Sequence, residues 1–187
     1  LNRDGTPAAG NPFAARAGVS REVWSYGHRN ILGLAFAGDG KLWALEHGPR
    51  GGDEINLIVS GRNYGWPEVS EGDHYDGRAI QRHVTRPELA APATSWNPVI
   101  APGGMIVYRG TRFAEWHGNA LIAAMDPAAV VRVTFDGVSA REEARYPMEH
   151  RIRAIAEHPD GSVWIAEDGH GLASSRILRL TPAPLRR

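Results

Sequence analysis

Two short segments of the chain carry residue types that hold metal ions or anionic ligands. The first is Arg29-Asn30, which stands directly before an apolar run. The second is 47–56, where small residues precede Asp53 and Glu54. Small residues let backbone carbonyls point to one spot, and carboxylates add hard oxygens, of which calcium prefers about six to eight. The pattern favours a calcium site, although such a turn can also be only solvated and an Arg-Asn pair can cap turns.

A third segment contains Arg151 and Arg153, separated by one residue in an apolar alternating run. Side chains at positions i and i+2 of a strand point to the same face. Both guanidinium groups could therefore reach one anionic ligand and bind it bidentately. An exposed strand face with two solvated charges is equally compatible with this spacing.

The composition excludes several classes of function. Lys+Arg and Asp+Glu are equal at 21 each, so no bulk charge indicates binding to nucleic acid or to an anionic membrane. There is no cysteine, which excludes disulfides and thiolate metal sites. No apolar run approaches the roughly 18 residues of a membrane span. The chain begins at Leu1 without a signal-peptide pattern, and we expect it to be part of a longer protein.

An internal repeat indicates which elements position these residues. Residues 39–46 and 160–167 both read Asp-Gly-x-φ-Trp-φ-φ-Glu, where φ is apolar. Each copy follows an alternating apolar run and precedes, after a loop, another one. This order predicts an antiparallel meander of strand, Asp-Gly turn, strand, loop and strand. A weaker copy lies between them, with predicted strands at 104–108, 119–124 and 130–135.

The spacing of the turns is that of propeller blades. The separation of Gly118 and Gly161 is about one blade. The longer separation of Gly40 and Gly118 implies an insertion over roughly 62–98. Long loops in compact domains are usually functional or disordered, and the aromatic residues of this insertion favour a functional loop. Asp136-Gly137 is expected to close the middle unit.

These observations predict an all-β fold of about three four-stranded antiparallel β-propeller blades. The whole chain, 1–187, is expected to be part of one propeller domain, with 1–20 as a connector or a remnant of a preceding blade. Propellers close with about four to eight blades. The remaining blades must come from missing N-terminal blades of the same protein or from a second copy of this chain.

Several ordered motifs resemble the soluble glucose/sorbosone dehydrogenases, the aldose sugar dehydrogenases that depend on pyrroloquinoline quinone (PQQ). The motifs are Arg29-Asn30-Ile31-Leu32-Gly33-Leu34, His47-Gly48-Pro49 with Asp53-Glu54-Ile55-Asn56, and Asn63-Tyr64-Gly65-Trp66-Pro67. The similarity continues through 96–105 and 151–153 and covers about 20–181. It implies the C-terminal half of a six-bladed propeller, in an enzyme that oxidises aldoses at C1 to lactones with PQQ and calcium.

The resemblance implies roles for single residues. The positions that match quinone contacts are Arg29, Asn30, Tyr75, Arg151 and Arg153. Tyr75 is matched less securely, because the length of its loop varies.

Four further residues match calcium ligands of the family. Gly48 and Pro49 match positions whose carbonyls hold the calcium that bridges to PQQ. Glu54 and Tyr64 match ligands of a second, structural calcium, Tyr64 through its carbonyl.

Two departures from the family pattern are visible. Asp126 stands where the family commonly has a lysine, and it would repel a tricarboxylate cofactor. The family's general base is a histidine of the N-terminal half, and none of the eight histidines here matches its motif. No catalytic residue is therefore expected in this chain, which alone should not catalyse the reaction.

Two other functions remain open. The chain could form a non-catalytic propeller module that keeps a calcium site. A lactone hydrolase would need a carboxylate cluster at the axis, which Asp126 and Glu167 do not convincingly make. For the enzyme, we expect a sugar substrate, an unidentified electron acceptor, no nucleic acid partner and, from the resemblance, a periplasmic or secreted location.

Overall fold

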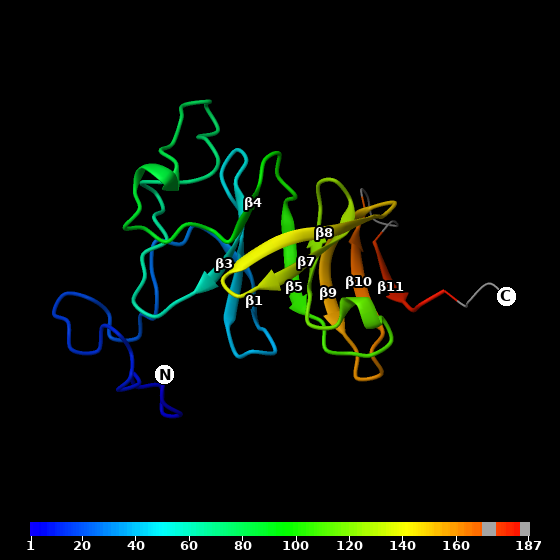
Figure 1. Cartoon of the computed structure of the whole chain (residues 1–187), viewed down its shortest axis with the longest axis horizontal. Coiled ribbons are helices and arrows are strands. Elements are labelled where there is room, and N and C mark those ends of the chain that lie inside the picture. The colour runs from blue at the N-terminus through cyan, green and yellow to red at the C-terminus, as the bar shows by residue number, and fades with distance from the viewer. Residues whose placement is uncertain (170–174, 184–187) are drawn as a thin grey trace.

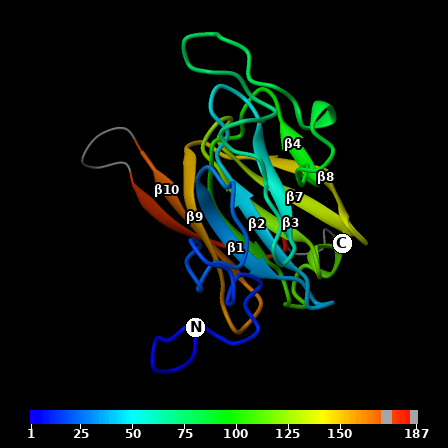
Figure 2. The same cartoon turned by 90° about the vertical axis from the view of Figure 1, so that its left-hand side faces the viewer.

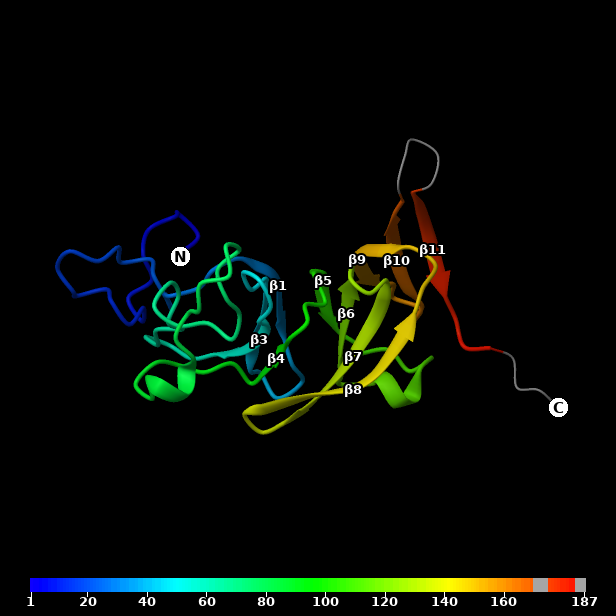
Figure 3. The same ribbon diagram turned by 90° about the horizontal axis from the view of Figure 1, so that it is seen from above.

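The computed structural model describes residues 1–169 and 175–183, in which three antiparallel sheets stand side by side in chain order (Figure 1, Figure 3). Blade 1 contains β1 (Ile31–Phe36), β2 (Leu42–Glu46), β3 (Asp53–Ile58) and β4 (Thr94–Trp96). Blade 2 contains β5 (Pro102–Val107), β6 (Ala120–Ala124), β7 (Ala129–Asp136) and β8 (Ser139–Pro147). Blade 3 contains β9 (Arg151–Glu157), β10 (Val163–Asp168) and β11 (Arg176–Leu180). The predicted all-β blades are confirmed.

Both copies of the repeat fold into the predicted hairpins. Strand β1 pairs with β2, and β9 pairs with β10, all antiparallel. Gly40 and Gly161 have φ of 81° and 78°, a conformation that glycine adopts without steric cost. The preceding aspartates close the turns, because Asp39 accepts the N–H of Lys41 and Asp160 accepts the N–H of Ser162.

The structure adds elements that the sequence did not predict. Asp136-Gly137 does not close the middle unit, because it is the turn into a fourth strand, β8. The expected insertion 62–98 ends in β4, which pairs with β3, and contains a short 3-10 turn, η1 (His83–Thr85); a second turn, η2 (Ala114–Trp116), follows β5. Blade 3 has three strands among the described residues. Residues 1–20 form no strand or helix, and 184–187 of the expected domain lie outside the described residues.

The first strands of the blades lie next to one another and begin at the same end of the molecule. Glycines allow this close approach between neighbouring strands. A Cβ at Gly33 of β1 would lie 2.8 Å from the Cβ of Met105 of β5. A Cβ at Gly103 of β5 would lie 2.3 Å from the carbonyl oxygen of Arg153 of β9. Strands β1, β5 and β9 are therefore neighbours across the three blades. The insertion that follows β3 extends beyond the sheets (Figure 2).

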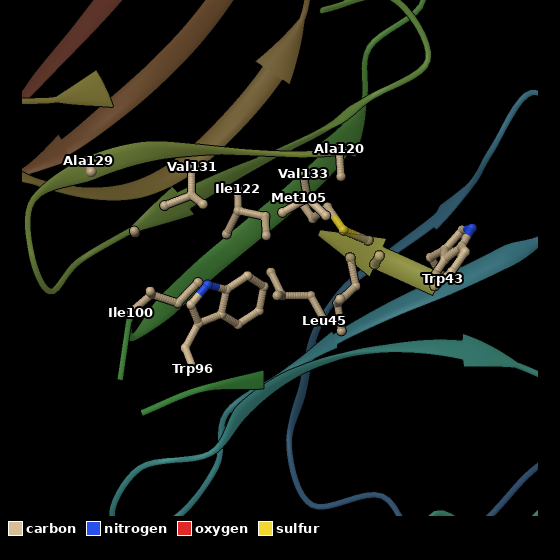
Figure 4. Packing of buried hydrophobic residues seen from close by; sticks show 13 residues of the cluster. Trp43, Leu45, Trp96, Ile100, Met105, Ala120, Ile122, Ala129, Val131 and Val133 are labelled. Atoms are coloured by element: carbon tan, nitrogen blue, oxygen red, sulfur yellow. The ribbon is translucent and has the colours of Figure 1, made fainter. Parts of the chain in front are cut away.

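Two apolar clusters hold the blades together. The first lies between blades 1 and 2 and includes Trp43, Leu45, Trp96, Ile122 and Met105 (Figure 4). Its largest side chain, Trp43, is fully buried, and burial of such a side chain stabilises a fold by roughly 1.5–3 kcal/mol. The second cluster, around Tyr108, Leu121 and Ile165, joins blades 2 and 3.

A polar contact also joins blades 1 and 2. The β7–β8 hairpin extends toward blade 1 (Figure 3), where the indole N–H of Trp96 donates to Glu142 at 2.7 Å. No helix among residues 1–169 and 175–183 has the length and apolar character needed to span a membrane.

Candidate functional site

Arg29 lies where the loop before β1, the turn between β2 and β3, and the insertion meet. Its Nη1 donates to the carbonyl of His47 at 3.1 Å, and its Nη2 donates to the hydroxyl of Tyr75 at 3.3 Å. The guanidinium also lies 5.3 Å from the ring centroid of Trp66, within cation–π range. Tyr75 is 74% exposed, and Asn30 is exposed as well. The structure thus brings Arg29, Asn30 and Tyr75 together at an open edge.

Glu46, the last residue of the first repeat copy, holds the backbone of Arg29. It is 3% exposed, and its Oε2 accepts the N–H of Arg29 at 3.0 Å. Its Oε1 accepts from Asn56 Nδ2 at 3.0 Å and lies 2.7 Å from His28 Nδ1. The sequence did not identify Glu46 as part of the site. The sequence feature that could have identified Glu46 is its position at the end of the repeat, directly before the 47–56 segment.

The turn after β2 presents two backbone carbonyls. Gly48 and Pro49 are buried, and a Cβ at Gly48 would lie 2.2 Å from the carbonyl oxygen of Gly51. Only glycine fits this cradle. Within residues 1–169 and 175–183, the carbonyl oxygens of Gly48 and Pro49 accept no hydrogen bond from a protein donor. Two uncommitted oxygens on neighbouring residues suit a hard cation such as calcium.

Asp53 holds two backbone segments together, so its carboxylate oxygens are not free to bind a metal ion. It is fully buried, and its Oδ1 accepts the N–H of Gly48 at 3.0 Å. Its Oδ2 accepts the N–H groups of Ile100 and Ala101, at 2.8 and 2.7 Å. Both oxygens are therefore committed to backbone donors, and the carboxylate joins the Gly48 turn to the start of β5.

Glu54 and Tyr64 line one small enclosed cavity in blade 1. Its volume is about 10 Å³, roughly the space that one water-sized sphere needs. The lining also includes Glu46, Gly48 and Ser70. Burial raises the pKa of Glu54 to about 7, and the nearby Glu46 carboxylate acts in the same direction.

The lining of this cavity includes ligand types that a single calcium ion could use. Two carboxylates, a hydroxyl and nearby backbone carbonyls are the ligand types that calcium uses. Across the described part of the chain, no group of three or more His, Asp or Glu side chains gathers in a metal-binding arrangement. An ion here would therefore depend on backbone oxygens as well as carboxylates.

His83, a residue of the insertion that no motif singled out, contacts the backbone of Tyr64, which lines the cavity. It is 4% exposed, and its Nε2 lies 3.1 Å from the carbonyl oxygen of Tyr64. Its Nδ1 lies 3.0 Å from Glu71 Oε1. The insertion thus fixes the Tyr64 carbonyl through a contact that joins positions far apart in the sequence.

Arg151 and Arg153 begin β9 and point to one face, as their spacing predicts. Nη2 of Arg153 donates to Asp168 Oδ2 at 2.5 Å, and Nη2 of Arg151 lies 3.9 Å from the same oxygen. Both guanidinium groups are partly exposed. The sequence missed Asp168, which reduces the positive charge that an anionic ligand would meet.

A chain of hydrogen bonds connects the two groups of predicted site residues. Ile100 and Ala101, which Asp53 holds, accept the N–H groups of Asp126 and Met125, both at 3.1 Å. The sulfur of Met125 then lies 3.4 Å from Arg151 Nη2. Ala101 has φ of 46°, a left-handed conformation that costs a non-glycine residue roughly 1–3 kcal/mol. Asp126 is exposed at this junction.

An open pocket of about 630 Å³ adjoins Pro49 and Tyr75. Its other lining residues include Arg50, Asp73 and Asn97. Pockets of about 300–1,000 Å³ are typical of small-molecule sites. The pocket is thus bordered by Pro49, one of the two residues with an uncommitted carbonyl, and by Tyr75, which Arg29 contacts.

Comparisons with known proteins show the family to which this chain is related. The family model described as Glucose / Sorbosone dehydrogenase matches residues 1–179. Aldose sugar dehydrogenase YliI of Escherichia coli is 35% identical over 179 residues, which are 92% of this chain and 47% of that protein. The chain spans about half the length of the curated relatives it matches.

Solved structures show the same relationship. The apo-form of soluble aldose sugar dehydrogenase from Escherichia coli aligns with a TM-score of 0.85 and 32% identity, over 96% of this chain and 52% of that one. The PQQ-bound form of aldose sugar dehydrogenase from Streptomyces coelicolor aligns with a TM-score of 0.68 and 30% identity, over 97% of this chain and 50% of that one.

Proposed function

This chain belongs to the glucose/sorbosone dehydrogenase family, and we propose that it forms the cofactor-holding part of a sugar dehydrogenase that uses PQQ and calcium. The observation that carries the proposal is the pair of uncommitted carbonyls at Gly48 and Pro49, close to the anchored guanidinium of Arg29. A solved relative in its PQQ-bound form, which aligns over 97% of this chain, supports the same assignment.

The chain's residues would bind and orient the cofactor. Gly48 and Pro49 would hold a calcium ion through their carbonyl oxygens. Arg29 and Asn30 would fix the edge of the quinone, with Tyr75 beside them at the rim. Bound PQQ would supply the hydride acceptor for oxidation of an aldose at C1 to the lactone, and calcium would supply a Lewis acid.

Two further arginines would meet the carboxylates of the cofactor. Arg151 and Arg153 lie on one face of β9 and carry fixed charge, which suits a planar anionic ligand. Glu54 and Tyr64 would hold a second calcium in the 10 Å³ cavity, where it would stabilise the turn and the insertion.

The acceptor for the sugar hydroxyl proton would come from outside this chain. His28 is engaged with Glu46 and Ser25, and His47 lies 3.4 Å from the buried Asp53. Both histidines therefore serve the scaffold. The full enzyme would need further blades, from the same polypeptide or a second copy, together with a sugar and an electron acceptor. A periplasmic or secreted location accompanies this proposal.

Turnover tests the proposal directly. A polypeptide that joins this chain to the part matching the other half of its relatives is loaded with PQQ and calcium. It is expected to oxidise aldoses while reducing an artificial dye, and Arg29→Ala is expected to lower the rate strongly. No activity in the intact, cofactor-loaded protein contradicts the proposal.

A non-catalytic calcium-binding module is the second candidate, and one observation favours it. Asp168 places a negative charge against Arg151 and Arg153, where an anionic cofactor would need net positive charge. Asp126 is exposed next to Met125, whose sulfur contacts Arg151. This candidate predicts calcium binding without saturable PQQ binding. Calorimetric titrations with each ligand separate the two functions.

A further inference from the structure

Glu46 lines the small cavity and also contacts the backbone of Arg29. The cavity lining includes Glu54, Gly48 and Arg29 itself. Oε2 of Glu46 accepts the N–H of Arg29 at 3.0 Å. The same buried side chain is thus in contact both with the space for a cation and with the residue that would hold an anionic cofactor.

The buried polar groups around Glu46 do not all have hydrogen-bond partners of their own. Asn56 Nδ2 lies 3.0 Å from Glu46 Oε1 and 3.4 Å from Glu54 Oε2, so one amide group serves two carboxylates. Asn56 is 1% exposed, and its Oδ1 has no hydrogen-bond partner. Unpaired buried polar atoms and neighbouring buried carboxylates are both costly. A divalent cation in the cavity would relieve the cost of the two carboxylates, because it neutralises them.

We propose that Glu46 couples the cavity to the cofactor edge: a divalent cation in the cavity fixes the Glu46 carboxylate, which in turn holds Arg29 in its ligand-binding position before any quinone arrives. The identities of cation and quinone rest on the proposed function. Glu46 acts here as a positioning residue, because it contacts Arg29 rather than the cofactor. By reciprocity, an anionic ligand at Arg29 strengthens binding of the cation.

The second repeat copy supplies a matched control. Glu167 occupies the same repeat position as Glu46 and is 4% exposed. It accepts from Arg176 Nε at 2.6 Å and does not line the cavity. Strand alternation turns it away from the face of Asp168. Glu167→Gln therefore removes an equally buried carboxylate without touching Arg29.

The decisive readout is amide hydrogen exchange at Arg29, measured by NMR on the 187-residue chain with calcium alone and no quinone. Calcium is expected to slow this exchange about tenfold, within the usual range of coupling between sites. The slowing is expected to persist in Glu167→Gln and to vanish in Glu46→Gln. Glu54→Gln separates occupancy from coupling, because it also lines the cavity but has no contact with the Arg29 backbone. Excess calcium should restore protection in Glu54→Gln, but not in Glu46→Gln.

The exchange experiment tests the coupling through Glu46 independently of the proposed function. Calcium binding that leaves Arg29 exchange unchanged overturns the coupling, as does protection that survives in Glu46→Gln or an absence of calcium binding. A separate PQQ titration at saturating calcium tests the proposed function. In that titration, Glu46→Gln should weaken PQQ binding roughly tenfold and Glu167→Gln should leave it unchanged.

Discussion

The two copies of the repeat have the same local structure but different surroundings. Both 39–46 and 160–167 form an Asp-Gly turn followed by a central strand. Trp43 is fully buried and stacks on Phe135 of blade 2 at 4.3 Å, whereas Trp164 is 37% exposed. The repeat therefore determines the blade, while the neighbouring blade determines how much of it is buried.

The glutamates at the ends of the two copies differ in the same way. Glu46 and Glu167 are both buried, but Glu46 holds the Arg29 backbone and Glu167 holds Arg176. Glu46 is part of the site because the segment before its hairpin contains Arg29, whose backbone Glu46 contacts. The repeat is mainly scaffold: its turn lies away from the site, and only in the first copy does its last residue contact a site residue.

Replacing the tryptophan of each copy should give the largest difference in unfolding free energy between the two copies. Trp43→Ala is expected to lower the free energy of unfolding by about 3–5 kcal/mol, as for other buried aromatic residues. Trp164→Ala should cost only about 1 kcal/mol, because its side chain is already partly in water. Urea unfolding of both variants measures the difference. Equal losses would contradict the assignment of burial to the neighbouring blade.

Glu54 should make the stability of blade 1 depend on pH. Its pKa is raised from 4.5 to about 7 by burial, so the folded chain retains a proton that the unfolded chain releases between these values. The free energy of unfolding of the metal-free chain should fall by about 1–3 kcal/mol as pH rises from about 4.5 to 7. Urea unfolding in the presence of a chelator follows this decrease. Glu54→Gln should remove this decrease in unfolding free energy. If the decrease is unchanged in that variant, another group causes it.

Asp160 of blade 3 should produce a smaller effect of opposite sign. The Ser162 hydroxyl, followed by its backbone N–H, lowers the pKa of Asp160 below the usual 3.8. The stabilisation is present above that value and is lost as pH falls below it. Asp160→Asn should therefore reduce the dependence of the melting temperature on pH between about 4 and 2. A variant that retains the full acid dependence would show that other carboxylates cause it.

The sequence predicted the parts of the fold that local patterns encode. The hairpins follow from the alternating runs and the Asp-Gly turns. Strand β8 escaped prediction because Ser139–Pro147 is largely polar and exposed on alternate residues, as expected of an outer strand. Strand β4 has only three residues at the end of a Gly- and Pro-rich insertion.

Motifs predicted the candidate site residues, but they did not predict the residues that support them. Arg29 donates to the Tyr75 hydroxyl and lines one cavity with Tyr64. His83 and Asp168 were missed because their partners depend on how a long insertion folds and on the register of β9 against β10. Neither kind of contact leaves a periodic signal in the sequence.

The proposed function requires this chain to bind PQQ with calcium at the end of blade 1. The most direct test titrates PQQ into the 187-residue chain at saturating calcium and follows the quinone absorbance. We predict saturable binding with one quinone per chain, weakened roughly tenfold or more by Arg29→Ala and by removal of calcium, as expected for loss of charged hydrogen bonds. The absence of a saturable change, or binding indifferent to both Arg29 and calcium, would contradict the account.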